Sequence, residues 1–420
     1  MDPLSPRAAA AGSHGCELPD RIEQLDGGPF VGNLTFYHFN MIVSGISTAI
    51  VLFVMFGLMG RHAMRMSNPQ EQLKIMRICN LLPSYQVLSF ASICFPNSYI
   101  YLQGYTEVFN GIALYSFLML LCDFMAPTDQ SKVEFFSSLE TKRQWQPKKK
   151  RNGLAFLKLT WWSVLQYPLI TLGTAVSQTV TQALHVYCLS SMAPHYSHVW
   201  LQVVTSLSTS VAINAIIQFY MHMRGYMTEN KPLTKFLAFK LVVGLILLEK
   251  VSLKHPAEYK SSKKEALTRF KVIFLILNGT GTLTKVKSLT YVDTAMGLPT
   301  MVICVQMVPI SFLMLNAYRT QPYEISNKTP HTMRPRAYQA LDEDVDDEAL
   351  MNGFKKRYQG GWMGLHAWAV YLGPLTLFMD VKEAYVMIHK ARSAQKAHYK
   401  EHMPVQMEPS MERYDSPEGA

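Results

Sequence analysis

The sequence lacks the patterns by which most enzymes, metalloproteins and nucleic-acid-binding proteins are found. It contains no phosphate-binding glycine loop, no zinc-ligand spacing and no residues spaced like a catalytic nucleophile and its base. The six cysteines show no metal-ligand spacing. We therefore expect no catalytic residues, no metal site and no cofactor, and hence a protein that is not an enzyme.

Charged residues are also scarce, at 17% of 420 residues, whereas hydrophobic residues make up 49%. The mean hydropathy of +0.06 hides a sharp partition. Across residues 36–320, apolar runs alternate with short polar loops, and both tails are hydrophilic. Because a bilayer-spanning helix needs about 20 apolar residues, the sequence predicts an all-α, polytopic membrane protein.

The apolar runs predict a bundle of seven transmembrane helices. They cover residues 36–60, 75–95, 107–125, 156–178, 199–221, a segment from 236, and 294–318. Lys and Arg are frequent in the loops after the first, third and fifth runs, whereas residues 179–198 contain none. By the positive-inside rule, the N-terminus is extracellular or lumenal and the C-terminus is cytoplasmic.

The net charge of +10 then indicates topology and contact with anionic cytoplasmic lipids, so no nucleic-acid partner is expected. We expect an integral protein of the plasma membrane or an endomembrane. Residues 1–35 have no basic start followed by an apolar core, so they are predicted to be a disordered extracellular tail without a cleaved signal peptide. Cys94 and Cys188, near the outer side, are candidates for pairing, and buried free thiols are the alternative.

The sixth run is interrupted. Residues 236–248 are too few to span a bilayer, and a strongly basic stretch follows before apolar character resumes at Val272. Joining Lys250 to Val272 restores one full-length helix, so residues 251–271 are predicted to be an insertion. The alternative is a broken helix of the kind that transporters use to build a site.

Residues 321–420 are predicted to be a cytoplasmic tail. An acidic run at residues 342–348 is typical of a disordered, solvated segment. Residues 358–395 combine aromatic and apolar residues with lysines, which predicts a C-terminal amphipathic helix lying on the cytoplasmic membrane surface. The last residues are expected to be disordered.

Polar residues recur along the membrane helices at helical spacing, most regularly every fourth position from Gln202 in the fifth run. Such faces favour a neutral polar cavity, although Ser, Thr and Asn also pack membrane helices together. Asp123 and Lys240 lie near cytoplasmic helix ends and are expected to extend to the interface. The candidate substrate-binding residues are Asn40, Ser44, Gln166, Tyr167, Thr174, Gln178, Gln202, Ser206, Ser210, Asn214, Glu249 and Gln306.

Several short motifs, in order across the seven helices, resemble those of the organic solute transporter alpha family, which includes the transmembrane protein 184 group. They are Tyr115-Ser116-Phe117 with Asp123, Leu165-Gln166-Tyr167, Phe219-Tyr220, Lys235-Phe236-Leu237 with Lys240, Ile303-Cys304-Val305-Gln306-Met307, and Pro322-Tyr323. The resemblance implies a seven-helix membrane protein. In the best-known animal members it also implies carriage of steroid-derived anions together with a single-pass partner subunit.

The chain departs from the family pattern at charged positions. Gln306 and Asn110 stand where the pattern has glutamates, Thr171 stands at an arginine position, and Glu249 stands at a glutamine position. These exchanges argue against a mechanism that depends on those charges.

The sequence therefore predicts a transporter or facilitator of amphipathic organic solutes, sterol-like or lipid-like, through a neutral polar cavity. One alternative is a non-transporting membrane protein that serves trafficking, scaffolding or lipid organisation, and another is a seven-helix receptor. The expected partners are the lipid bilayer and either a single-pass subunit or further copies of the chain.

Overall fold

The computed structural model describes residues 29–226 with short gaps at 32, 127–128, 144–145 and 189–192, then residues 297–324, 359–372, 381–382 and 385–386. These residues fall into two compact units. The first comprises residues up to 127 and 159–373, and the second comprises residues 128–158 and 374–420. Glu249, Lys240 and the predicted insertion at residues 251–271 lie outside the described residues.

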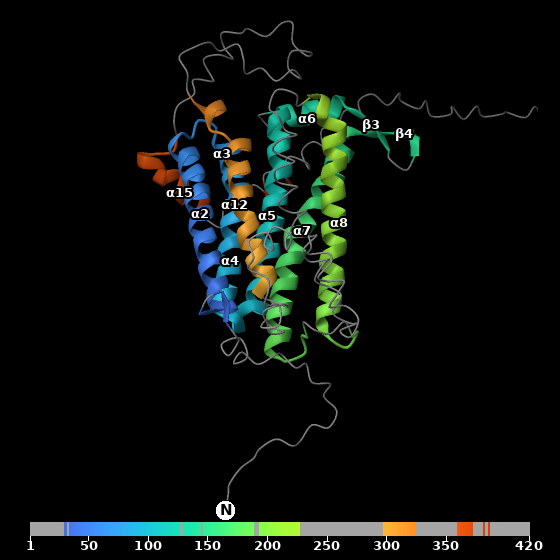
Figure 1. Ribbon diagram of the computed structural model, residues 1–420. Coiled ribbons are helices and arrows are strands. Elements are labelled where there is room, and N and C mark those ends of the chain that lie inside the picture. The colour runs from blue at the N-terminus through green and yellow to red at the C-terminus, as the bar shows by residue number, and fades with distance from the viewer. Residues whose placement is uncertain are drawn as a thin grey trace, which may run out of the picture. The chain divides into compact units, whose positions relative to one another are not determined.

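The first unit is a bundle of helices (Figure 1). Its helices are α2 (Phe36–Met64), α3 (Pro69–Cys79), α4 (Leu81–Cys94), α5 (Tyr99–Met125), α7 (Gly153–Ala183), α8 (Ser197–Met223) and α12 (Leu298–Ala317). Among the residues that the structure describes, four stretches are long and apolar enough to cross a membrane, namely Phe36–Met64, Tyr99–Met125, Ser197–Tyr226 and Leu298–Tyr323. The prediction of a helical membrane protein is thus confirmed, whereas the number of seven helices stays a prediction.

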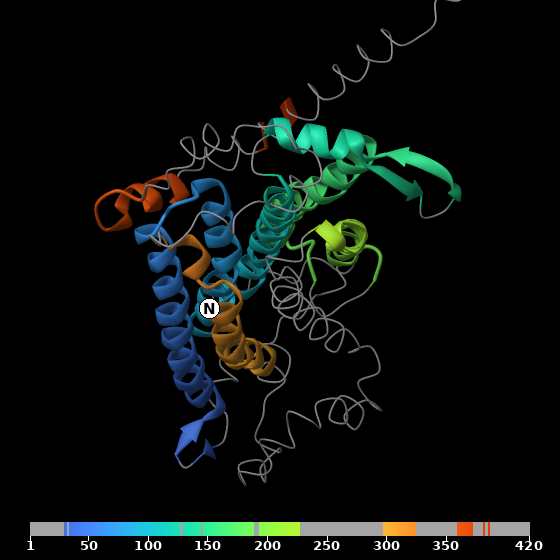
Figure 2. The same ribbon diagram turned by 90° about the horizontal axis from the view of Figure 1, so that it is seen from above.

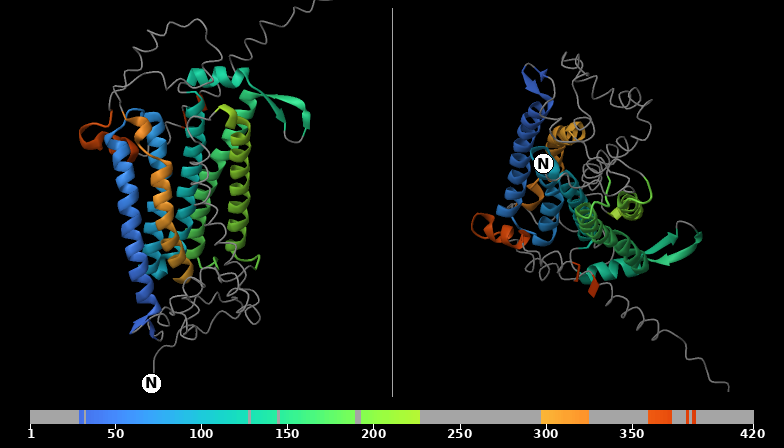
Figure 3. Two further views of the ribbon diagram at one scale, coloured as in Figure 1. Left: turned by 45° about the horizontal axis from the view of Figure 1, so that its top comes forward. Right: turned by 90° about the horizontal axis from the view of Figure 1, so that it is seen from below.

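Helix α5 is the central element of this bundle. It packs against α3 and α4, and α4 packs in turn against α2 and α12. In the most apolar stretch of α5, 83% of the residues are buried inside the structure. The corresponding share for the stretch Ser197–Tyr226, which contains α8, is 22%. Figure 2 shows α5 between the α2–α4–α12 side and α7, and Figure 3 shows α12 beside α2.

The second predicted membrane helix is divided into α3 and α4 at Asn80. Pro83 explains the position of the break, because proline has no N–H to donate to the carbonyl of Cys79 one turn earlier. Helix α3 also begins six residues before the predicted start, with Pro69 in its first turn, where a missing N–H costs nothing.

Short elements join the helices of the first unit. Strands β1 (Pro29–Val31) and β2 (Leu34–Thr35) form an antiparallel pair just before α2. The 3-10 helices are η1 (Pro96–Ser98), η2 (Arg224–Tyr226), η6 (Gln321–Tyr323) and η8 (Trp362–Gly364). Cys188, after α7, is disulfide-bonded. Cys94 is free, so the candidate pairing of Cys94 with Cys188 is wrong and the alternative of a free thiol is confirmed for Cys94.

The C-terminal segment Gln359–Leu372 packs on α2 and α3. Gln359 donates its N–H to the carbonyl of Met66 at 2.7 Å. Gly360 lies so close to the Ala63 carbonyl that a side chain would collide with it. Helix α15 (Leu365–Leu372) then places Trp368 against Phe56 of α2, with ring centroids 6.2 Å apart. In the described residues the helix therefore starts at Leu365, seven residues after the predicted start at 358.

The second unit contains α6 (Asp129–Ser138), β3 (Glu140–Arg143), β4 (Gln146–Asn152) and the first turn of α7. The strands pair antiparallel, with Thr141 opposite Arg151. Gly153 closes the hairpin by donating its N–H to the carbonyl of Leu139 at 2.9 Å. The basic loop after the third predicted run thus forms a hairpin.

Candidate functional site

The candidate residues on α2 lie in a polar seam between α2, α4 and α12. Asn40 donates from Nδ2 to the Gly297 carbonyl at 3.0 Å and accepts from the Ser44 hydroxyl at 2.9 Å. Further along, Gln86 of α4 donates to the Thr48 hydroxyl at 3.2 Å and to the Cys304 carbonyl at 3.3 Å. Asn40 therefore ties α2 to the residue just before α12, whereas the Ser44 hydroxyl bonds within α2.

The candidate residue Tyr167 of α7 reaches α5, where it meets a carboxylate. Its hydroxyl donates to Glu107 Oε2 at 2.8 Å and accepts from Asn110 Nδ2 at 2.9 Å. Asn110 Nδ2 also lies 3.5 Å from Glu107 Oε2, and Thr209 of α8 lies beside Tyr167. We call Glu107, Asn110 and Tyr167 the Glu107 cluster.

Two glycines on α5 allow α7 to approach closely enough for these contacts. A Cβ atom at Gly111 would lie 2.7 Å from Pro168 Cα, and one at Gly104 would lie 3.2 Å from Ala175 Cα. Small residues let membrane helices pack backbone to backbone in this way. One turn further along α7, Gln178 donates to the Ile100 carbonyl at 2.6 Å.

Helix α7 also bonds α8 through candidate residues. Gln166 and Ser208 form a reciprocal pair, in which the Ser208 hydroxyl donates to Gln166 Oε1 at 2.7 Å and Gln166 Nε2 donates to the Ser208 carbonyl at 3.0 Å. The Thr205 hydroxyl donates to the Thr174 hydroxyl at 3.4 Å. The face of α8 that meets α7 is thus made by Thr205 and Ser208.

The predicted polar stripe on α8 lies on another face of that helix. Ser206, Ser210 and Asn214 are exposed in the described structure. Gln202 donates to the Ser206 hydroxyl at 3.1 Å, and the Ser210 hydroxyl donates to the Ser206 carbonyl at 2.8 Å, so both bonds stay within α8. Gln306, on α12, is half-buried.

Glu107 is not a candidate on sequence grounds because it falls at the first position of the predicted membrane helix 107–125. The structure starts α5 at Tyr99, which moves Glu107 more than two turns into the helix. The signal was present in the sequence, since residues 99–106 contain no charge and no proline. Glu107 is half-buried.

Glu107 also stands out by its charge. The stretch of α2 up to Gly60, α4, α7 from Leu159, α8 and α12 contain no Asp, Glu, Lys or Arg. The charged residues of α5 are Glu107 and Asp123. Within α2, α4, α5, α7, α8 and α12, Glu107 is therefore the formally charged residue that lies furthest from a helix end.

Asp123 does not extend to the interface as predicted. It is 3% exposed, and Lys74 Nζ lies 2.5 Å from its Oδ2. This buried ion pair joins α3 to α5 at the end of the bundle where α2, α5 and α12 finish and Arg61, Arg65 and Arg77 are found. We call this end the basic end.

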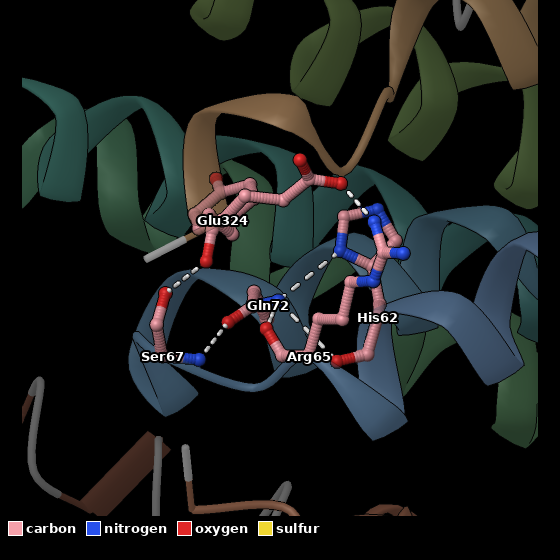
Figure 4. A network of polar contacts seen from close by, with 6 residues as sticks. His62, Arg65, Ser67, Gln72 and Glu324 are labelled. Carbon is pink, nitrogen blue, oxygen red and sulfur yellow. Dashed lines mark hydrogen bonds and ion pairs between the residues drawn. The ribbon is translucent and has the colours of Figure 1, made fainter. Parts of the chain in front are cut away.

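A second network at the basic end ties the α2–α3 turn to α12 (Figure 4). Gln72 Oε1 accepts from the Ser67 N–H at 2.8 Å, while its Nε2 donates to the Arg65 carbonyl at 3.0 Å. The fully buried His62 places Nε2 3.0 Å from the Tyr318 carbonyl, which assigns the ring proton to that nitrogen. Arg65 and Glu324 form an ion pair beside it. These contacts fix helix positions and leave the Glu107 cluster as the candidate site.

Comparison with known proteins gives the following matches. The sequence model of the organic solute transporter Ostalpha family matches residues 40–323. Protein LAZ1 of Arabidopsis thaliana is 26% identical over 221 residues, which are 48% of this chain and 44% of that protein. A transmembrane protein 184 homolog of Dictyostelium discoideum is 23% identical over 202 residues, covering 46% and 39%. The chain thus spans less than half the length of these relatives, and no solved structure matches it.

Proposed function

Because the chain belongs to the organic solute transporter Ostalpha family, we propose that it is an integral membrane transporter of amphipathic organic solutes. The observation that supports this proposal is the row of polar side chains along α7, which runs from Gln166 to Gln178. At ~1.5 Å per residue, this row is ~18 Å long, more than half of the ~30 Å hydrocarbon core.

The chemistry of this row suits a solute with a polar group and an apolar body. Hydroxyl and amide groups of Gln166, Thr174 and Gln178 donate and accept without carrying charge. Leu169, Leu172 and Val176, between them in the sequence, are exposed apolar side chains on another face of α7. We therefore propose sterol-like or lipid-like solutes as the substrate class, with helix-to-helix hydrogen bonds exchanged for solute contacts during passage.

We further propose seven membrane helices, with the N-terminus outside and the C-terminus in the cytoplasm. The distribution of Lys and Arg in the loops supports this orientation. The disulfide at Cys188 supports it too, because disulfides persist in oxidising compartments. A single-pass partner subunit or a second copy of the chain is proposed as the partner.

The α2–α4–α12 seam favours one second candidate, a non-transporting membrane protein that organises trafficking or lipids. There the polar groups of Asn40, Ser44 and Thr48 already bond other groups of the bundle. Such a seam builds a stable bundle without providing a path for a solute.

Uptake into vesicles distinguishes the transporter from the non-transporting membrane protein. Purified protein is placed in vesicles of zwitterionic lipid, with and without a co-expressed single-pass subunit, and uptake of labelled steroids is measured against empty vesicles. We expect saturable uptake that Gln166→Leu reduces, whereas Ser177→Ala, on the exposed face of α7, leaves it unchanged. Uptake no greater than that of empty vesicles under every condition would exclude the transporter.

A further inference from the structure

We propose that the C-terminal segment Gln359–Leu372 inserts its apolar side chains into the lipid interface at the basic end of the bundle. We call this segment the α2 clip, because it docks on the end of α2. Its partner is the boundary between the head groups and the acyl chains of the membrane that α2 crosses. This inference concerns the C-terminal tail and does not depend on whether the chain transports a solute.

Contacts that only glycine permits hold the α2 clip on α2. A Cβ atom at Gly360 would overlap with the Ala63 carbonyl oxygen, and one at Gly364 would lie 2.8 Å from the carbonyl carbon of the same residue. Gly364 also has a φ of 77°, in the left-handed region that larger residues rarely adopt. Ala367, one turn further along, is fully buried. The α2 clip therefore turns small residues toward α2, which lets the two backbones approach closely.

Backbone hydrogen bonds complete this fit. Gln359 donates its N–H to the Met66 carbonyl at 2.7 Å, and within the α2 clip Ala367 donates to the Gly360 carbonyl at 3.3 Å. Backbone groups without partners are costly in lipid. These bonds therefore suit a segment that lies at the membrane boundary.

The contact with Phe56 sets the depth of the α2 clip. Phe56 lies five residues before Arg61, the first charged residue at this end of α2, which is ~7.5 Å of helix toward the apolar centre. Trp368 of α15 packs against the Phe56 ring, with centroids 6.2 Å apart, and Figure 1 shows α15 beside α2. The α2 clip therefore reaches from the level of Ala63 into the apolar part of α2.

The remaining surface of the α2 clip is apolar and exposed. Its large exposed side chains are Trp362 at 78%, Met363 at 66%, Leu365 at 57% and Leu372 at 71%. Phe53, one turn from Phe56 on the same face of α2, is 83% exposed. This surface thus continues the side of α2 that faces lipid. Aromatic and aliphatic side chains at such a level are typical of the membrane interface.

The α2 clip differs from the predicted amphipathic helix in what holds it. A free amphipathic helix binds a membrane through lipid contacts alone. The α2 clip is also fixed to α2, through Gly360 and Gly364. Insertion into lipid and docking on α2 are therefore two separate properties, and each has its own measurement.

Insertion is measured with a nitroxide label on Leu365→Cys or Leu372→Cys in the full chain, in which Cys94→Ser removes a half-buried thiol. In nanodiscs of zwitterionic lipid, collisions of the label with oxygen and with a water-soluble nickel complex give its depth. We expect both labels about 5–10 Å into the boundary between head groups and acyl chains. A label on Gln70→Cys, exposed on α3, is the water-accessible control. Nickel access at Leu365 and Leu372 equal to that at Gln70 would overturn the proposal.

The same labels distinguish lipid from a protein partner. Protection from the nickel complex in nanodiscs that hold the chain alone supports insertion into lipid. If a single-pass subunit covered this surface instead, both labels would be accessible in the chain alone and protected only after co-expression of the subunit. That result would also overturn the proposal.

Docking is measured by a pair of labels on Met64→Cys and Leu365→Cys, which should broaden each other's spectra because the two residues lie close together. Gly360→Ala should abolish this broadening, since its Cβ atom would meet the α2 backbone. Gly57→Ala, where a Cβ atom meets nothing within 4 Å, should leave it unchanged. Broadening that persists in Gly360→Ala would contradict the docking. Thermal unfolding of both glycine variants checks that the bundle is intact, and the depth measurement needs neither of them.

Discussion

At the residue scale, Gly111 lies where any larger residue would collide with the backbone of α7. A Cβ atom there would be 2.7 Å from Pro168 Cα, and backbone cannot rotate away as a side chain does. We expect Gly111→Ala to lower the free energy of unfolding by about 1–3 kcal/mol, the range for overpacking. Thermal unfolding of the purified protein in detergent measures this change.

Gly173 on α7 provides the matched control. A Cβ atom there meets nothing within 4 Å, so Gly173→Ala adds a methyl group without a collision. Alanine also favours the helix over glycine, by up to about 1 kcal/mol. We expect no loss of stability. Equal losses for the two variants would show that the α5–α7 contact is looser than the structure has it.

The Lys74–Asp123 pair gives a second prediction. Both side chains are buried, with 9% and 2% exposed, so removing one partner leaves a buried charge. We expect Lys74→Met to cost about 3–5 kcal/mol and the double variant Lys74→Met with Asp123→Leu to cost much less. Unfolding of the two single variants and the double variant measures the coupling. Additive losses would contradict a direct interaction.

Asp123 and Glu107 show what sequence reasoning can reach at this scale. The sequence identified Asp123 as an acidic residue near a helix end, whereas Glu107 was only the first residue of the predicted helix 107–125. It could not find Lys74 as a partner, because the two residues are 49 positions apart and meet only through the packing of α3 on α5. Nor could the sequence link Glu107 to Tyr167. That contact requires the close approach of α7 to α5 that Gly104 and Gly111 allow.

At the scale of elements, the contact between α7 and α8 depends on the reciprocal Gln166–Ser208 pair. Interhelical hydrogen bonds in membranes contribute about 0.6 kcal/mol on average and up to about 1.7. We therefore expect Gln166→Leu and Ser208→Ala to be non-additive by about this amount in a double-mutant cycle of unfolding.

Ser206 and Ser210 serve as controls on the exposed face of the same helix. Combined with Gln166→Leu, Ser206→Ala or Ser210→Ala should give strictly additive losses. Coupling as large as that of Ser208 would place the predicted stripe at the α7 interface after all.

Helix α8 has two polar faces, which is why the sequence alone could not show which of them meets α7. Periodicity shows which residues share a face, and Gln202, Ser206, Ser210 and Asn214 do share one. It does not show which way that face points, because Thr205, Ser208 and Thr209 form a second small polar face of similar quality. Only the packing of Ser208 against Gln166 decides between them.

At the scale of the whole molecule, the disulfide at Cys188 offers a test of the proposed orientation. In intact cells that express a Cys94→Ser variant, an impermeant maleimide should label Cys188 only after reduction, if residues 184–197 lie outside. Cys79 and Cys122, buried near the basic end, should remain unlabelled until the membrane is opened. Labelling of Cys188 only after permeabilisation would reverse the orientation.

The membrane helices were accessible to sequence reasoning because hydrophobicity acts locally, along each run of residues. The described helices coincide with six of the seven predicted positions, with shifts where Pro83 divides a helix and where α5 starts eight residues early. The sixth predicted helix lies outside the described residues. The docking of Gln359–Leu372 on α2 was not foreseen, since it depends on Gly360 and Ala63, nearly three hundred residues apart.

The glycine contacts between α5 and α7 also have a mechanical consequence. If α7 slid along α5, its backbone would leave the two glycines, Gly104 and Gly111, and meet the side chains of neighbouring α5 residues. We therefore expect α5 and α7 to move together as one rigid unit. In the proposed transport cycle, a change between an inward-open and an outward-open state would then occur at helix contacts that consist of only a few hydrogen bonds. The Gln166–Ser208 pair is such a contact, so under the proposed transport function we expect α8 to move against the α5–α7 pair.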